Sequence, residues 1–213
     1  APSPEAVAGL RRRYDLIGGR TPLRAITAET AEALQATLDA RSPGEYRTYV
    51  AMKHWHPYIG DVIPRMAADG VRRVIAIVLA PHYSRMSVGS YRQYVEEAIA
   101  KLDAPMDLAF VESWHLEPAF LALVAGRVRE GLAAFPEGDR SETCVLFSAH
   151  SLPVRIRTWD DPYEAQLLAS SEAVARETGL RNWRFAWQSA GHTGEPWLGP
   201  DIVDYLETLH AEG

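Results

Sequence analysis

Short runs of apolar and β-branched residues alternate along the chain with longer segments in which apolar residues recur every three to four positions. The short runs predict strands at Tyr46–Met52, Arg73–Leu79, Met106–Ser113, Cys144–Ala149 and Trp183–Gln188. The longer segments predict helices at Ser3–Ile17, Thr27–Ala40, Pro57–Ala68, Ser90–Leu102, Pro118–Ala134, Pro162–Thr178 and Pro200–His210. Strands separated by helices of this length predict parallel βαβ units and a doubly wound α/β fold.

The long helix predicted at Pro118–Ala134 reads as a crossover between two lobes, so we expect domains at residues 1–115 and 116–213. The chain opens on a helix, although doubly wound folds usually open on a strand, and it closes on a helix that should lead into another strand. We therefore expect an internal piece of a longer protein. Its first lobe would lack the first strand, and its second lobe would be incomplete.

Composition narrows the class of protein. Hydrophobic residues make up 47% and charged residues 23% of the 213 residues, which is typical of a soluble globular protein. The net charge of −6 argues against a nucleic-acid-binding protein. The lone Cys144 excludes an intramolecular disulfide, and no apolar run approaches the roughly 18 residues of a membrane span. With no signal peptide visible, we expect a cytoplasmic protein without an integral membrane segment.

Polar and aromatic residues gather directly after four of the predicted strands. In an open α/β sheet, ligands bind beyond the carboxyl ends of the strands. The segments at that edge are Lys53–Pro57, Pro81–Ser87, Phe147–Pro153 and Trp187–Asp201. Among their histidines, His150 stands out because it ends a buried strand and is flanked closely by two serines. His54 and His56 read equally well as ordinary loop residues, and His82 and His192 as structural or solvated ones.

Two common enzyme classes lack support in these segments. The nucleophile elbow G-x-S-x-G does not occur, and Ser148 and Ser151 lie too near His150 in sequence to imply a catalytic triad. No Walker loop or G-x-G-x-x-G fingerprint is present, so nucleotide binding has no support either.

Four stretches of the chain resemble the ferrochelatase family. The segment Phe147–Pro153, followed by Asp161-Pro162-Tyr163, resembles that family's active-site signature, and Gln188–Asp201 resembles its second motif. Supporting matches lie at Tyr14–Leu23 and at Leu79–Ser84 together with Val88–Tyr91. The similarity runs in order over essentially all 213 residues.

The resemblance implies two Rossmann-like lobes around a porphyrin cleft. It also implies insertion of ferrous iron into coproporphyrin III or protoporphyrin IX in haem biosynthesis, with Fe²⁺ as a substrate and no organic cofactor. His150 matches the family's catalytic histidine. A neutral imidazole can accept a pyrrole proton near neutral pH and can also bind iron, and both roles stay open.

Further site residues follow from similarity to the coproporphyrin-using branch of the family. Arg13, Tyr14, Thr21 and Tyr91 align with residues that line the porphyrin site. Guanidinium and hydroxyl groups suit the propionate carboxylates of such a ligand. Arg13 can equally belong to an ordinary solvated helix face. Lys53 and His54 match positions near the metal face of the porphyrin.

The chain also departs from the family pattern. The family's second metal-site residue, a glutamate, would come after Gly213, and the first strand, which carries a tyrosine, would precede Ala1. We therefore expect this chain to be inactive alone. Asp160 occupies a position where family members often have glycine, which predicts a slightly different turn before Asp161.

Other functions remain open from the sequence. One is a cobalt or nickel chelatase acting on a more reduced tetrapyrrole. Another is a porphyrin- or haem-binding module without catalysis, and a third is a solute-binding lobe of the periplasmic type. The sequence also leaves open the choice between the two porphyrins, the presence of an iron–sulfur cluster in the whole protein, and the oligomeric state.

Overall fold

The computed structural model describes residues 3–191 and 193–212. The chain divides into two compact units, one of Ala1–Val71 with Ala98–Ala104 and the other of Arg72–Glu97 with Pro105–Gly213. This border differs from the one at residue 115 that the crossover helix indicates. The division into two Rossmann-like lobes at residue 115 stays a prediction.

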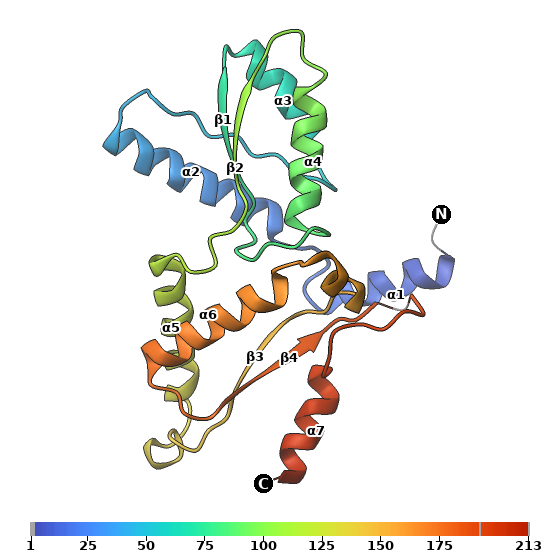
Figure 1. Ribbon diagram of the computed structural model, residues 1–213, viewed down its shortest axis with the longest axis vertical. Helices are drawn as coiled ribbons and strands as arrows, with labels where there is room; N and C mark the ends of the chain where they lie inside the picture. The colour runs from blue at the N-terminus through green and yellow to red at the C-terminus, as the bar shows by residue number, and fades with distance from the viewer. Residues whose placement is uncertain (1–2, 192, 213) are drawn as a thin grey trace. The chain divides into compact units, whose positions relative to one another are not determined.

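Four strands in the second unit form two parallel pairs (Figure 1). Strand β1 (Arg73–Ile77) pairs with β2 (Asp107–Val111), and helix α4 (Val88–Ile99) lies between them in sequence. Strand β3 (Val145–His150) pairs with β4 (Trp183–Gln188). The predicted α/β class with parallel sheets is confirmed, and each strand lies within or next to its predicted run.

Two helices flank the second pair of strands. Helix α6 (Tyr163–Thr178) connects β3 to β4 and packs along α5 (Pro118–Ala133). Helix α7 (Ile202–Glu212) follows β4 and lies against it. Helix α5 begins at its predicted proline, since proline suits the first helical turn. Two short 3₁₀ helices, η1 (Glu137–Asp139) and η2 (Val154–Trp159), were not predicted.

The first unit contains three helices in the described residues: α1 (Pro4–Asp15), α2 (Leu23–Arg41) and α3 (Ile59–Ala68). Helix α1 ends before Gly18 and Gly19, whose positive φ angles of 86° and 79° turn the chain away. Helix α3 buries one apolar stripe, formed by Ile59, Val62, Ile63 and Met66. Helix α2 starts four residues before its predicted first residue.

The predicted strand at Tyr46–Met52 is wrong. Its only pairing within the described residues is an isolated bridge between Met52 and Tyr58. Instead, the side chain of Gln35 in α2 forms hydrogen bonds with the backbone of this segment. It donates to the carbonyl of Tyr46 at 3.0 Å and accepts from the N–H of Thr48 at 2.7 Å. Two backbone polar groups of the segment are therefore satisfied without a neighbouring strand.

A left-handed residue ends η2. Asp160 has φ 52° and ψ 35°, a conformation that aspartate tolerates better than most residues and that glycine adopts without strain. The turn before Asp161 thus needs a left-handed residue, which explains why glycine suits this position. In the described part of the chain, no helix has both the length and the apolar character needed to cross a membrane.

Candidate functional site

The imidazole of His150 stands at the carboxyl end of β3, directly beside the end of β4. His150 is the register partner of Gln188, and its side chain is exposed. Its carbonyl oxygen accepts a hydrogen bond from the Tyr163 hydroxyl at 3.2 Å. The next residue, Ser151, is buried, and its hydroxyl donates to the carbonyl of Leu198 at 2.8 Å. The chain is therefore held at the His150 carbonyl and at the next residue, while His150 itself is exposed.

The loop after His150 and the loop after β4 form one structure. Pro153 and Trp197 form an antiparallel bridge. The N–H of Val154 donates to the carbonyl of Pro196, and the N–H of Leu198 donates to that of Leu152, both at 2.9 Å. An ion pair between Arg155 and Glu195 at 3.2 Å adds to this connection. The two motifs that resemble the ferrochelatase signature thus lie together at the edge of one sheet.

A glycine allows the second loop to close over an indole ring. A Cβ built on Gly191 would lie 2.3 Å from a ring carbon of Trp197, closer than two carbon atoms can approach. The indole N–H of Trp197 donates to the Thr193 hydroxyl at 3.0 Å, which holds the ring in place. Only glycine therefore fits at position 191 without moving the ring.

An apolar cluster packs against both loops. Its buried members are Ile156, Leu167, Trp187 and Leu198. Met86, Leu152, Val154 and Tyr163 pack against it. The cluster joins residues of η2, α6, β4 and the loops after β1, β3 and β4, so the position of His150 depends on the packing of several separate segments.

Helix α6 also binds the loops that follow β1 and β2. The Gln166 side chain accepts from the N–H of Tyr83 at 2.7 Å and donates to the Ser113 hydroxyl at 3.4 Å. One turn further on, Ser170 donates to the carbonyl of His115 at 2.8 Å. Gln166 and Ser170 were not predicted as site residues from the sequence. The available signal was a pair of uncharged polar residues four positions apart on one face of a helix.

The side chain of His82 lies among other protein side chains. Its Nε2 lies 2.9 Å from the Ser170 hydroxyl, and its ring centroid lies 5.9 Å from that of His115. Burial, and to a lesser extent the neighbouring His115, together lower the pKa of His82 to about 4. Burial also lowers the pKa of His115, whose Nδ1 has no hydrogen-bond partner in the described part of the chain. His82 is therefore neutral at pH 7 and serves as a packing and hydrogen-bonding group.

Tyr91 lies in the first turn and a half of α4 and is half-buried. The start of this helix is held by the carbonyl of Ser84, which accepts from the N–H groups of Ser87 and Gly89 at 3.1 and 2.9 Å.

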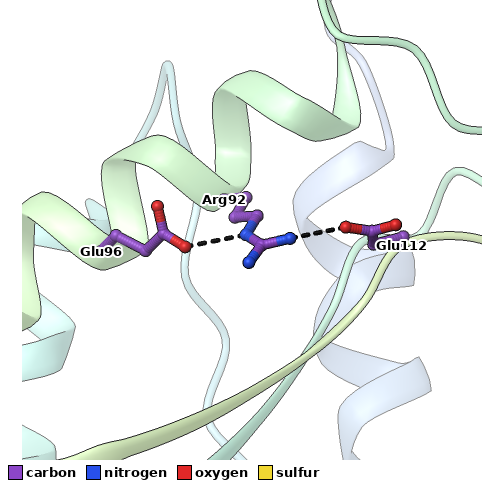
Figure 2. Close-up of polar contacts among 3 residues, drawn as sticks. All are labelled: Arg92, Glu96 and Glu112. Carbon is purple, nitrogen blue, oxygen red and sulfur yellow. Dashed lines mark hydrogen bonds and ion pairs between the residues drawn. The ribbon is translucent and has the colours of Figure 1, made fainter. Parts of the chain in front are cut away.

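The residue after Tyr91, Arg92, lies between two carboxylates (Figure 2). Its guanidinium donates to Glu96 at 2.8 Å and to Glu112 at 2.5 Å. The hydrogen bond that Arg92 donates to Glu96 is the largest cause of the raised pKa of Arg92.

The other predicted porphyrin-site residues belong to the first unit. Arg13 and Tyr14 lie near the end of α1, and Thr21 lies in the connection to α2, where its hydroxyl oxygen accepts from the N–H of Leu23 at 3.3 Å. All three are exposed. Lys53 is half-buried and His54 is exposed, in the segment before α3. That these five residues share a cleft with His150 and Tyr91 stays a prediction.

Among the described residues, His150 does not belong to a cluster of metal-binding side chains. Within residues 3–191 and 193–212, no three His, Cys, Asp or Glu side chains lie close enough together to hold a metal ion. The arrangement at His150 can therefore supply one exposed imidazole, as a base or as a single ligand.

Comparison with known proteins identifies the chain's relatives. The family model for ferrochelatase matches residues 2–213. A ferrochelatase from Herpetosiphon aurantiacus is 47% identical over 100% of this chain and 70% of the relative. Coproporphyrin III ferrochelatases from Anoxybacillus flavithermus and Oceanobacillus iheyensis are 43% and 40% identical, over 99% and 98% of this chain and 67% of each relative. The chain therefore belongs to the ferrochelatase family.

Proposed function

We propose that His150 is the catalytic residue of a ferrochelatase reaction, the insertion of ferrous iron into a porphyrin in haem biosynthesis. The observation that carries this proposal is the geometry of β3, which ends on an exposed histidine whose carbonyl and following residue are held by hydrogen bonds. An imidazole at the carboxyl end of a parallel strand is placed where α/β proteins bind their ligands.

The reaction requires proton transfer as well as metal delivery. Two N–H protons leave the pyrrole nitrogens, and Fe²⁺ takes their place, so the charge on the porphyrin core stays balanced. A neutral imidazole can accept such a proton near pH 7 because its ordinary pKa is close to 6.5. His150 is exposed, so solvent can remove the proton again after each transfer.

We infer that the porphyrin is coproporphyrin III, which carries four propionates. The names of the relatives at 43% and 40% identity support this substrate. Arg13, Tyr14 and Thr21 are exposed, and their guanidinium and hydroxyl groups suit carboxylates. In this proposal they bind propionates together with Tyr91. Lys53 and His54 lie near the metal face of the porphyrin.

The full-length protein should be assayed without oxygen, with Fe²⁺ and either coproporphyrin III or protoporphyrin IX. We expect a higher kcat/KM with coproporphyrin III, because it offers two more carboxylates than protoporphyrin IX. The variant Arg13→Ala should raise KM for coproporphyrin III, whereas Arg11→Ala, a matched change on the same exposed helix, should not. Equal or better turnover of protoporphyrin IX, or equal effects of the two variants, would contradict this choice of substrate.

A further inference from the structure

Asp161 connects two segments that are far apart in sequence. One carboxylate oxygen accepts from the Ser84 hydroxyl at 3.0 Å and from the N–H of Arg85 at 2.7 Å. The other accepts from the N–H of Tyr163 at 3.1 Å. A carboxylate can serve three donors at once because both of its oxygens are acceptors, whereas an amide offers only one accepting oxygen.

A chain of hydrogen bonds connects Asp161 to Tyr91 through Ser84 and Ser87. Ser84 is fully buried at 0% exposure, and its carbonyl accepts the N–H groups of Ser87 and Gly89, which start α4. The N–H of Tyr91 then donates to the carbonyl of Ser87 at 3.3 Å. The position of Ser84 thus determines where α4 begins and where Tyr91 lies.

A second chain of hydrogen bonds connects Asp161 to His150 through Tyr163. Its bond to the N–H of Tyr163 holds the first turn of α6, and the Tyr163 hydroxyl donates to the carbonyl of His150. Tyr163 also packs on the apolar cluster beneath the site. The carboxylate is therefore two contacts away from His150 on this side.

We propose that Asp161 is a positioning residue that sets the place of Tyr91 relative to His150, and so aligns a bound porphyrin with the imidazole. This inference rests on the proposed function, in which Tyr91 binds a propionate and His150 accepts pyrrole protons. The residue touches neither the substrate nor the reacting atoms in this account.

The neighbouring Asp160 provides a matched control. It is exposed and carries the same charge, and no hydrogen bond of its carboxylate connects it to the loop after β1 within the described residues. Its left-handed φ of 52° is tolerated by asparagine as well as by aspartate. Asp160→Asn therefore removes one negative charge at the same place in the sequence without breaking the connection to Ser84.

The test is a double-mutant cycle in the full-length protein with Asp161→Asn, Tyr91→Phe and the double variant. Asp161→Asn should raise KM for coproporphyrin III about tenfold, the scale of one lost charge-assisted hydrogen bond. It should change kcat less than KM, because the Tyr163 hydroxyl still holds His150. In the Tyr91→Phe background the same change should have a much smaller effect, since its route is already broken. Asp160→Asn should leave KM unchanged.

Equal effects of Asp161→Asn in both backgrounds, or an equal effect of Asp160→Asn, would overturn the proposal. If Asp161→Asn does not fold, Ser84→Ala replaces it. This change keeps the carboxylate and removes the Ser84 hydroxyl, which donates to Asp161 and accepts from the N–H of Met86 at 3.2 Å. Porphyrin binding, followed by fluorescence quenching with coproporphyrin III, gives the same cycle without turnover. A protein that binds porphyrin with the predicted coupling but inserts no iron would remove the proposed function and leave the positioning role of Asp161 standing.

Discussion

The hydroxyl of Tyr163 donates a 3.2 Å hydrogen bond to the carbonyl oxygen of His150. Tyr163 is the first residue of α6, and His150 is the last residue of β3, so this bond connects the end of the strand to the start of the helix. Burial raises the pKa of the Tyr163 hydroxyl, and the charge of Asp161 raises it further, so the phenol keeps its proton as a donor.

Tyr163→Phe should remove this bond while keeping the ring in the apolar cluster. We expect the free energy of unfolding to fall by about 1 kcal/mol, the usual net value of one such hydrogen bond. Iron insertion should slow more than porphyrin binding weakens, because the imidazole loses its backbone support. Tyr205→Phe on α7 is the control, since the Tyr205 hydroxyl makes no hydrogen bond in the described residues. Urea unfolding of the two variants checks the prediction, which fails if they are equally stable.

Gly191→Ala should force Trp197 to move. The added methyl group would meet the indole at 2.3 Å, and overpacking of this kind costs about 2 kcal/mol. Gly126→Ala in α5 is the matched change in open space, because nothing lies within 4 Å of the added atom. It should stabilise the protein by up to about 1 kcal/mol, as alanine is the better helix former. If Gly191→Ala is as stable as the parent, with unchanged Trp fluorescence, the described closeness of glycine and indole is contradicted.

The half-buried His82 should make stability depend on pH. Its pKa is about 4 in the folded chain and near 6.5 when unfolded, so between these values the unfolded state binds the extra proton. Stability should therefore be full above pH 6.5 and fall as the pH drops toward 4, by at most about 1.4 kcal/mol per pH unit from this group. The lowered pKa of His115 acts in the same direction.

His82→Gln isolates this contribution, because glutamine can still bond to Ser170 but does not titrate. Unfolding measured in urea between pH 5 and pH 7 should show a shallower pH dependence for the variant than for the parent. Parallel curves would mean that His82 is not the buried neutral group described here.

Local signals in the sequence predicted most helices and four strands, because caps, prolines and apolar periodicity act over a few residues. The segment Tyr46–Met52 has the composition of a strand, yet its backbone forms hydrogen bonds with the side chain of Gln35, eleven residues before Tyr46. Whether a β-prone segment becomes a strand depends on a partner that composition does not reveal.

The site was predictable to the extent that it lies in contiguous motifs. The resemblance identified His150 and the loop that contains Gly191, and the structure brings those segments together. Gln166 and Ser170 escaped notice, because their importance arises only where α6 meets the loops after β1 and β2. Asp161 was part of a recognised motif, but its contact with Ser84 spans 77 residues and required the fold to be seen.

The most direct test of this account is the rate of iron insertion by His150→Ala in the full-length protein, measured together with porphyrin binding and thermal stability. We predict a rate about 10²–10⁴-fold lower, the usual cost of a lost general base, with a folded protein that still binds coproporphyrin III. Binding should survive because the propionate contacts lie on other residues. A variant that stays folded and inserts iron at the parental rate would contradict the account and remove His150 from the mechanism.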